Sequence, residues 1–136
     1  MRRDFRIAAA LALVASLGAA ARPAVAQSPD ARFANPARFM AATGEGLYAD
    51  ICQGCHMPEG VGAVGAGAYP ALARNPKLAA AGYPLALVVR GRNGMPPFGD
   101  LLTDAQVAAV VNYVRTHFGN HFADEVTAAD AKAARP

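Results

Sequence analysis

Several features that would assign a chain to a common class of protein are missing from this 136-residue sequence. No segment shows a sustained alternation of apolar and polar side chains, the pattern of a half-buried strand, so we expect an all-α fold. The longest apolar run, Ile7 to Ala21, has about 15 residues, whereas a membrane-spanning helix needs roughly 20. Only two cysteines occur, so the second tight cysteine pair of a typical structural zinc site is absent.

The first 26 residues are predicted to be a secretory signal peptide. Three arginines within the first six residues precede the apolar run, and residues 24–26 (Ala-Val-Ala) have the small-x-small pattern that signal peptidase reads. Cleavage is expected before Gln27, which would place the mature protein in the periplasm without a membrane span. A retained membrane anchor is the alternative, and the short apolar run disfavours it.

Removal of this segment changes the charge of the chain. The full sequence has 13 lysines and arginines and 10 acidic residues. Four of the arginines and one aspartate lie in residues 1–26, so the predicted mature chain has nine basic and nine acidic residues. No basic stripe remains that would neutralise a phosphate backbone, and we therefore expect no nucleic-acid partner.

The two cysteines are three positions apart, and a histidine follows the second. Cys52, Cys55 and His56 form the C-x-x-C-H pattern of covalent haem c attachment. Two thiols at this spacing can form thioethers with the two vinyl groups of a porphyrin, and the adjacent imidazole then faces the iron. A thioredoxin-like redox pair is an alternative, but that motif belongs to a βαβ context that this sequence lacks.

A zinc site is a second alternative for the same residues. It would combine Cys52, Cys55 and His56 with His117 or His121. For the last two histidines a surface or helix-capping position is the simpler interpretation.

The remaining sequence predicts about four helices. The predicted segments run from Thr43 into the cysteines, from Asn75-Pro76 to Gly82, from Tyr83-Pro84 to Gly91, and from Thr103 to Gly119. The last has the best signals, because Thr103 and Gln106 form a capping box. Helices with so many glycines bury little surface by themselves, so a haem would supply the missing core.

The predicted domain organisation has four parts. Residues 1–26 are the signal peptide, 27–42 an N-terminal leader in which Asn35-Pro36 could open a short helix, 43–119 the folded domain, and 120–136 a C-terminal tail. We expect this polar, alanine-rich tail to lie on the surface, with a turn of helix after Thr127.

Together these features resemble a class I c-type cytochrome over Gly44 to Gly119. Gly44 and Tyr48 match the family's small and aromatic positions where the N-terminal helix crosses the C-terminal one, and Val110 and Tyr113 match their partners on the other helix. The glycine, costly in a helix, is expected at such a close crossing. The resemblance implies the cytochrome c fold, with about four helices packed around one covalently attached haem.

The resemblance also implies a ligand set. Pro70 matches the proline whose carbonyl accepts the second ring proton of the haem histidine. The segment around Met95 (Gly-Met-Pro-Pro-Phe) resembles the family's distal loop, so His56 and Met95 are the expected iron ligands, with core packing as the alternative for Met95.

Haem propionates need polar partners. Tyr69 and Arg92 are candidates, as are Arg74 and Arg90, because guanidinium groups pair well with carboxylates. A solvated surface position is the alternative for each of these arginines.

Iron held by histidine and methionine has no open position for a substrate, so we expect an electron carrier without catalytic residues. The chain resembles small cytochrome c subunits of periplasmic dehydrogenases. Such proteins pass electrons from a dehydrogenase to another cytochrome or a terminal oxidase, as free carriers or bound subunits. The alternative is a haem-based catalyst or a gas or peroxide sensor in which Met95 is displaceable.

Overall fold

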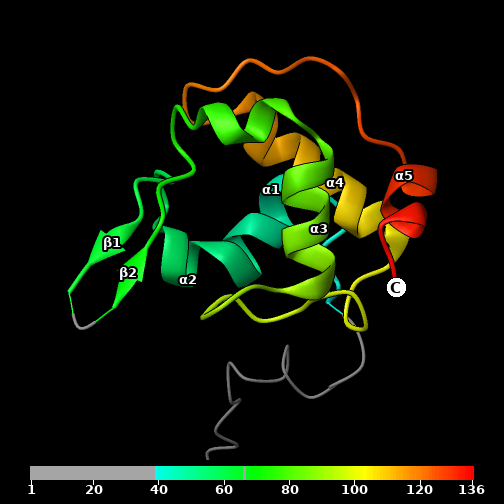
Figure 1. The fold of residues 1–136 in the computed structure, drawn as a ribbon, viewed down its shortest axis with the longest axis horizontal. Helices are drawn as coiled ribbons and strands as arrows, with labels where there is room; N and C mark the ends of the chain where they lie inside the picture. The colour runs from blue at the N-terminus through cyan, green and yellow to red at the C-terminus, as the bar shows by residue number, and fades with distance from the viewer. Residues whose placement is uncertain (1–38, 66) are drawn as a thin grey trace, which may run out of the picture. The chain divides into compact units, whose positions relative to one another are not determined.

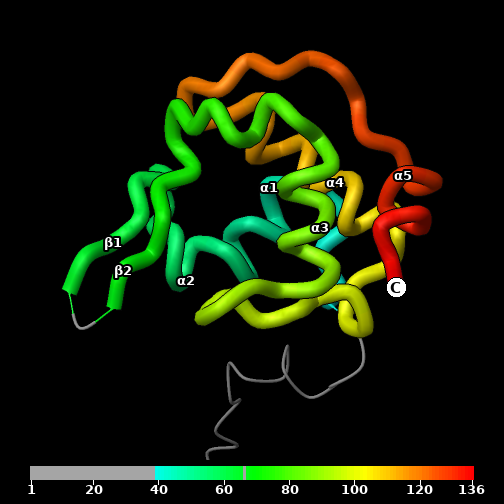
Figure 2. Tube along the Cα trace, viewed as in Figure 1, coloured from blue at the N-terminus to red at the C-terminus, as the bar shows by residue number. Residues whose placement is uncertain are grey.

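The computed structural model describes residues 39–65 and 67–136 (Figures 1 and 2). The predicted signal peptide, its cleavage position and the Asn35-Pro36 helix start lie outside the described residues. Within the described residues, no helix is both long enough and apolar enough to span a bilayer.

Most regular structure in the described part of the chain is helical. In chain order the elements are α1 (Gly44–Leu47), the π-helical turn η2 (Tyr48–Cys52), α2 (Gln53–His56), β1 (Ala63–Val64), β2 (Ala68–Tyr69), the 3-10 helix η3 (Pro76–Ala79), α3 (Gly82–Arg90), α4 (Asp104–Thr116) and α5 (Ala128–Ala133). The expected helical class is confirmed.

The antiparallel hairpin of β1 and β2 was not expected. It pairs Ala63 with Tyr69 and Val64 with Ala68, and Figure 1 shows it projecting from the helical body. Strands of two residues are too short for a two-residue alternation to show in the sequence.

One continuous helical segment carries the cysteine motif. Thr43 caps it, because its hydroxyl accepts a hydrogen bond from the Gly46 amide at 3.1 Å. The segment passes through α1, η2 and α2 without a break and ends at His56. The helix predicted from Thr43 into the cysteines is therefore confirmed, with a π-helical turn directly before Gln53 that the sequence did not indicate. Turns of this kind are frequent at functional sites.

Close contact between α1 and α4 explains the glycine at position 44. A Cβ atom on Gly44 would lie 2.2 Å from the Ala109 carbonyl oxygen and 2.6 Å from the Tyr113 Cβ. Beside this contact the rings of Tyr48 and Tyr113 lie with their centroids 5.6 Å apart, and Val110 is buried. The helix crossing expected from these four residues is therefore present.

Helix α4 forms the centre of the core. The capping box of Thr103 and Gln106 is present, and the Gln106 amide also donates to the carbonyls of Phe39 and Ala41 at 2.8 and 2.9 Å. Four valines at helical spacing are buried, namely Val107, Val110, Val111 and Val114. The helix ends at Thr116, earlier than expected, because the backbone of His117 is extended, and Phe118 then has a positive φ of 58°.

The two middle helices differ slightly from expectation. Asn75 caps the first through a 3.0 Å hydrogen bond from the Lys77 amide to its side chain, but that helix is a 3-10 helix ending at Ala79. Gly82 is the first residue of α3 and does not close the preceding helix. Gly91 terminates α3 as expected, with a φ of 69°.

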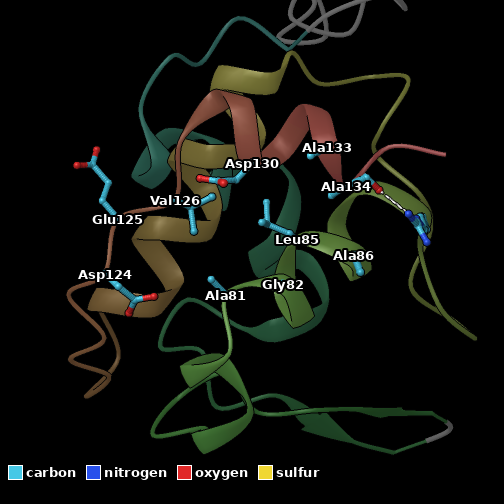
Figure 3. Close-up of a pocket in the computed structure, with 11 residues that line it drawn as sticks. Ala81, Gly82, Leu85, Ala86, Asp124, Glu125, Val126, Asp130, Ala133 and Ala134 are labelled. Carbon is cyan, nitrogen blue, oxygen red and sulfur yellow. Dashed lines mark hydrogen bonds between the residues drawn. The ribbon is translucent and has the colours of Figure 1, made fainter.

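Most residues of the C-terminal segment 120–136 are exposed, as expected, but the segment also packs against the core. Val126 and Ala131 belong to the hydrophobic core, and the Asn112 side chain both donates to and accepts from the Val126 backbone at 2.8 Å. The predicted turn of helix after Thr127 is confirmed as α5, which has a capping box of its own. Figure 3 shows side chains of this segment facing Leu85 of α3 across a shallow pocket.

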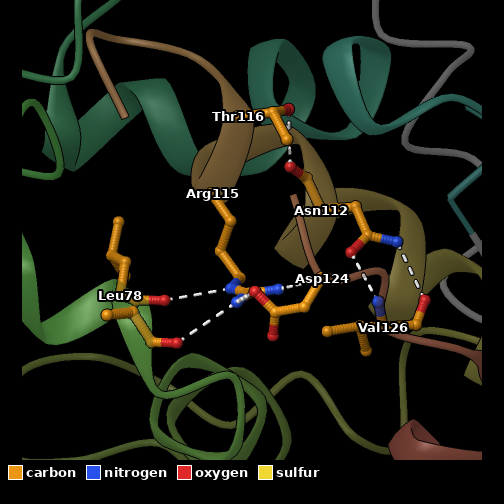
Figure 4. Close-up of polar contacts among 7 residues, drawn as sticks. Leu78, Asn112, Arg115, Thr116, Asp124 and Val126 are labelled. Atoms are coloured by element: carbon orange, nitrogen blue, oxygen red, sulfur yellow. Dashed lines mark hydrogen bonds and ion pairs between the residues drawn. The ribbon is translucent and has the colours of Figure 1, made fainter. Parts of the chain in front are cut away.

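A fully buried arginine connects α4 to the segment that follows it (Figure 4). The Arg115 side chain is 0% exposed and donates to the carbonyls of Leu78 at 2.9 Å, Ala79 at 3.2 Å and Asp124. It also forms a 2.6 Å ion pair with the Asp124 carboxylate, which is largely exposed. One cation therefore satisfies backbone carbonyls from two segments far apart in the sequence, as burial of a charge requires.

Replacing Gly44 with alanine should destabilise the fold by about 3 kcal/mol, because the new methyl group would overlap backbone atoms of α4. Urea denaturation of the purified protein measures this change. The matched control is Gly82→Ala, where a Cβ would meet no atom within 4 Å. That control should be neutral or stabilising by up to about 1 kcal/mol. Equal losses for the two variants would contradict the close crossing.

Stability should depend on pH through Asp124. The hydrogen bond from Arg115 holds the pKa of the Asp124 carboxyl below its ordinary value. The ionised carboxylate therefore stabilises the fold above that ordinary value, and this contribution is lost as the pH falls through the lowered pKa. Asp124→Asn should reduce the free energy of unfolding at pH 7, and the difference from the wild type should shrink steadily as the pH falls below the usual aspartate pKa of about 3.9. If urea denaturation gave the same difference in free energy of unfolding between the wild type and Asp124→Asn at every pH, the charge of Asp124 would contribute nothing to stability.

Candidate functional site

The two cysteines lie near the end of the first helical segment. Cys52 is the last residue of η2 and Cys55 lies in α2, so the two thiols are three positions apart on neighbouring turns of one helical face. Cys52 is half-buried, Cys55 is exposed, and neither forms a disulfide. Both thiols are therefore available to a common covalent partner.

The environment of Cys52 does not suit a redox pair. Burial, with a further contribution from Cys55, raises the pKa of the Cys52 thiol to about 12. Reactive cysteines in dithiol oxidoreductases have a lowered pKa, because the thiolate is the nucleophile. The Cys52 thiol is protonated at neutral pH, which argues against the thioredoxin-like alternative.

His56 is held by the carbonyl of Pro70. The imidazole Nδ1 lies 2.9 Å from the Pro70 carbonyl oxygen. A carbonyl only accepts, so Nδ1 carries a proton, and in the neutral ring Nε2 then has a free lone pair. This is the hydrogen bond that the resemblance implies, and it leaves His56 in the tautomer that a metal ligand requires.

The chain between His56 and Pro70 folds back on itself. The Gly62 amide donates to the His56 carbonyl at 3.0 Å, and the Tyr48 hydroxyl donates to the Met57 carbonyl at 2.7 Å. Gly62 has a φ of +71°, and a Cβ there would lie 2.3 Å from the Tyr69 carbonyl oxygen. Only glycine lets the backbone at position 62 approach the backbone at Tyr69 this closely, and this contact brings Pro70 to His56.

Met95 lies in a tight turn after α3. Its amide donates to the Arg92 carbonyl at 3.0 Å, and the Arg92 amide donates back to the Met95 carbonyl at 2.9 Å. Gly91 lies beneath this turn, because a Cβ there would lie 2.6 Å from the Met95 carbonyl oxygen and 2.7 Å from the Pro97 nitrogen. The half-buried Met95 is thus carried by a turn with a fixed backbone.

The other predicted site residues have different surroundings. Tyr69 is 43% exposed on β2, directly before Pro70, and Arg92 is exposed in the turn with Met95. Arg74 is exposed as well. The Arg90 side chain is engaged elsewhere, since its Nε and Nη2 both donate to the Ala134 carbonyl, at 3.0 and 2.9 Å.

The histidines and cysteines do not form a multidentate metal site. All of them are among the described residues, and no group of three or more histidine, cysteine or acidic side chains in that part of the chain could hold a metal ion. His117 stacks on Tyr113 with centroids 4.1 Å apart and hydrogen-bonds the Tyr113 carbonyl at 2.9 Å, while His121 is exposed. These surroundings fit the surface or capping interpretation and give the zinc alternative no support.

The residues present fit a covalently attached haem. The donor set consists of two unpaired thiols, an imidazole with a free Nε2 and a thioether on a separate turn, which is the chemistry of haem c attachment and ligation. Of the large apolar side chains exposed in the described residues, Val61, Val64 and Tyr69 lie between His56 and Pro70. The helical segment and the Met95 turn therefore supply the donors, and the segment between His56 and Pro70 supplies exposed apolar side chains.

The pocket in Figure 3 lies elsewhere. Residues of α3, α5 and the segment between α4 and α5 line it. Arg90, one of the candidate propionate partners, lines it, but the cysteines, His56, Pro70 and Met95 do not. The pocket is therefore separate from the proposed iron ligands and the attachment cysteines.

Comparison with known proteins finds a family match for the central part of the chain. Residues 39–114 match the family model described as cytochrome C oxidase, cbb3-type, subunit III. The match includes the cysteine motif, Pro70 and the turn with Met95. No curated protein matches the chain.

Replacing Gly62 with alanine should weaken the support of His56. The substitution strains a positive φ and pushes a methyl group into the Tyr69 carbonyl, so we expect a loss of about 2 kcal/mol in the free energy of unfolding. Gly65→Ala is the matched control in the same glycine-rich segment, because a Cβ there meets nothing within 4 Å. Urea denaturation of both variants checks this, and a Gly62 variant as stable as the control would refute the packing argument.

Proposed function

Because this chain belongs to the family of cytochrome c oxidase, cbb3-type, subunit III, a family of c-type cytochrome domains, we propose that it is a one-electron carrier with iron ligands His56 and Met95. Family membership gives it the cytochrome c fold and a covalently bound haem c, in the region of Cys52 and Cys55. The haem supplies an iron centre that gains and loses one electron.

The observation that carries this proposal is the hydrogen bond between His56 and Pro70. A histidine that ligates a metal generally donates its other ring proton to a carbonyl or carboxylate, which fixes the ring and makes the ligating nitrogen more basic. His56 has this arrangement at 2.9 Å, and it follows Cys55 directly. The cysteines that would form the thioether bonds and the histidine that would hold the iron therefore come from the same helical segment.

Met95 is proposed as the second iron ligand. Its turn is stiffened by the two prolines that follow it and by the paired backbone hydrogen bonds with Arg92. A neutral thioether favours the reduced iron and raises the potential compared with a second histidine. With His56 and Met95 both holding the iron, the chain would leave no position for a substrate, which favours electron transfer over catalysis.

The proposed cellular context rests on the N-terminal sequence and on the family match. We propose that the signal peptide is cleaved before Gln27 and that the mature protein works in the periplasm. Its partners would be redox proteins, with a periplasmic dehydrogenase as electron donor and a cytochrome or terminal oxidase as acceptor. The family description, which names an oxidase subunit, supports an acceptor of the oxidase kind.

Replacing Met95 with alanine should abolish the weak red absorption of the ferric protein that a methionine–iron bond produces, while the haem stays covalently attached through the cysteines. Met40→Ala is the control, because Met40 is 84% exposed and should leave the band unchanged. Absorption spectra of the two purified variants decide the point. A band that survives in the Met95 variant would sink the ligand assignment.

Carbon monoxide separates the carrier from a catalyst or sensor. In the wild-type ferrous protein at neutral pH we expect slow and incomplete binding, because Met95 has to be displaced first. Rapid and full adduct formation would favour the sensor or catalyst function.

A further inference from the structure

The turn with Met95 lies between two stems that are joined to each other. Its first stem is the end of α3, and its second stem begins at Phe98. The amides of Phe98 and Gly99 donate to the carbonyls of Val88 and Val89 at 2.9 and 3.1 Å. A Cβ on Gly99 would lie 2.8 Å from the Val89 carbonyl oxygen, so the stems are in direct backbone contact at this point.

Arg135 binds the second stem from the C-terminal end of the chain. Its guanidinium donates to the carbonyls of Gly99 and Leu102, the latter at 2.9 Å, and forms a 2.6 Å ion pair with Asp104 at the start of α4. The Arg135 and Asp104 side chains are 28% and 32% exposed, so the pair is shielded more than an ordinary surface salt bridge. Three acceptors from residues 99–104 are thus held by one side chain.

Ala134, the residue before Arg135, is hydrogen-bonded to the first stem. Arg90 is the last residue of α3, and its Nε and Nη2 both donate to the Ala134 carbonyl (Figure 3). Ala134 and Arg135 therefore connect the residue that precedes the turn to the residues that follow it. Hydrogen bonds to a charged group are stronger than those between neutral groups.

We propose that Arg135 is a positioning residue for Met95: by joining the two stems of its turn, the C-terminal end of the chain keeps the methionine bound to the iron. This inference rests on the proposed function, since it takes Met95 as an iron ligand. It adds a role for a segment that follows the family match, which ends at residue 114. Loss of this connection frees the turn to open, and opening releases the thioether.

The test compares Arg135→Ala with Lys132→Ala, Arg135→Lys and the wild-type protein, all haem-loaded. Lys132 is exposed in α5, three residues before Arg135, and its side chain makes no hydrogen bond or ion pair with the described residues. Stopped-flow mixing of the ferrous proteins with carbon monoxide measures how often Met95 leaves the iron. The red band of the ferric proteins reports the methionine bond independently.

We expect Arg135→Ala to bind carbon monoxide about tenfold faster than the wild type and to show a weaker red band. A tenfold change corresponds to a loss of ~1.4 kcal/mol in the free energy that keeps the turn closed. Lys132→Ala should match the wild type. Arg135→Lys keeps the charge but loses the planar fork, so it should restore the band only in part.

Two outcomes distinguish failure of the inference from failure of the proposed function. A wild-type red band that Arg135→Ala leaves unchanged, with an unchanged carbon monoxide rate, overturns the positioning role even if thermal stability falls. A wild-type protein without the band refutes Met95 ligation itself. If Arg135→Ala fails to fold, Asp104→Asn removes only the ion pair, and Arg90→Ala removes the bonds to the first stem. Both should accelerate carbon monoxide binding, and wild-type rates in both would overturn the inference.

Discussion

The rest of the site depends on the hydrogen bond that His56 makes to the Pro70 carbonyl. It fixes the tautomer of the imidazole, and it requires the chain to return to His56 after only 14 residues. Such a return needs backbone that side chains would obstruct, and Gly62 supplies it with a positive φ and a contact that excludes any Cβ. On the other loop Gly91 has the same role beneath Met95. Each proposed ligand therefore has a glycine behind its supporting loop.

Much of this arrangement could be predicted from the sequence, because its signals are local. The cysteine motif, the capping box of Thr103 and Gln106 and the end of α3 at Gly91 each occupy a few adjacent residues with one physical reason apiece. The close helix contact at Gly44 was predictable because a glycine destabilises a helix and is retained where a side chain would not fit. The Ala109 carbonyl is the group that a side chain there would overlap. The turn with Met95 is also built from adjacent residues, whereas the binding of Met95 to the iron stays a prediction.

The packing of the C-terminal segment could not be predicted, because its signals are not local. Arg115 and Arg135 bind mainly backbone carbonyls, which every residue has, so no pattern of side chains marks their partners. An arginine near the end of a helix is typical of a solvated surface, and only the fold shows that Arg115 is fully buried. Asn120 is similar, since its side chain joins the carbonyls of Leu72 and Val114. The tail was therefore expected on the surface.

The two sides of the proposed iron site differ in their dependence on the C-terminal end. His56 is fixed by Pro70, 14 positions away. The stems of the Met95 turn are joined directly by backbone hydrogen bonds between residues ten positions apart, but they are also held together by Ala134 and Arg135, through contacts 31 to 44 positions long. Contacts of long range are lost whenever the C-terminal end detaches, and chain ends open at the lowest free energy in most proteins. The histidine side keeps its support in such an opening, because its contacts lie within one segment. The methionine side is therefore where this protein should first loosen, and the arginines at positions 90 and 135 oppose that loosening.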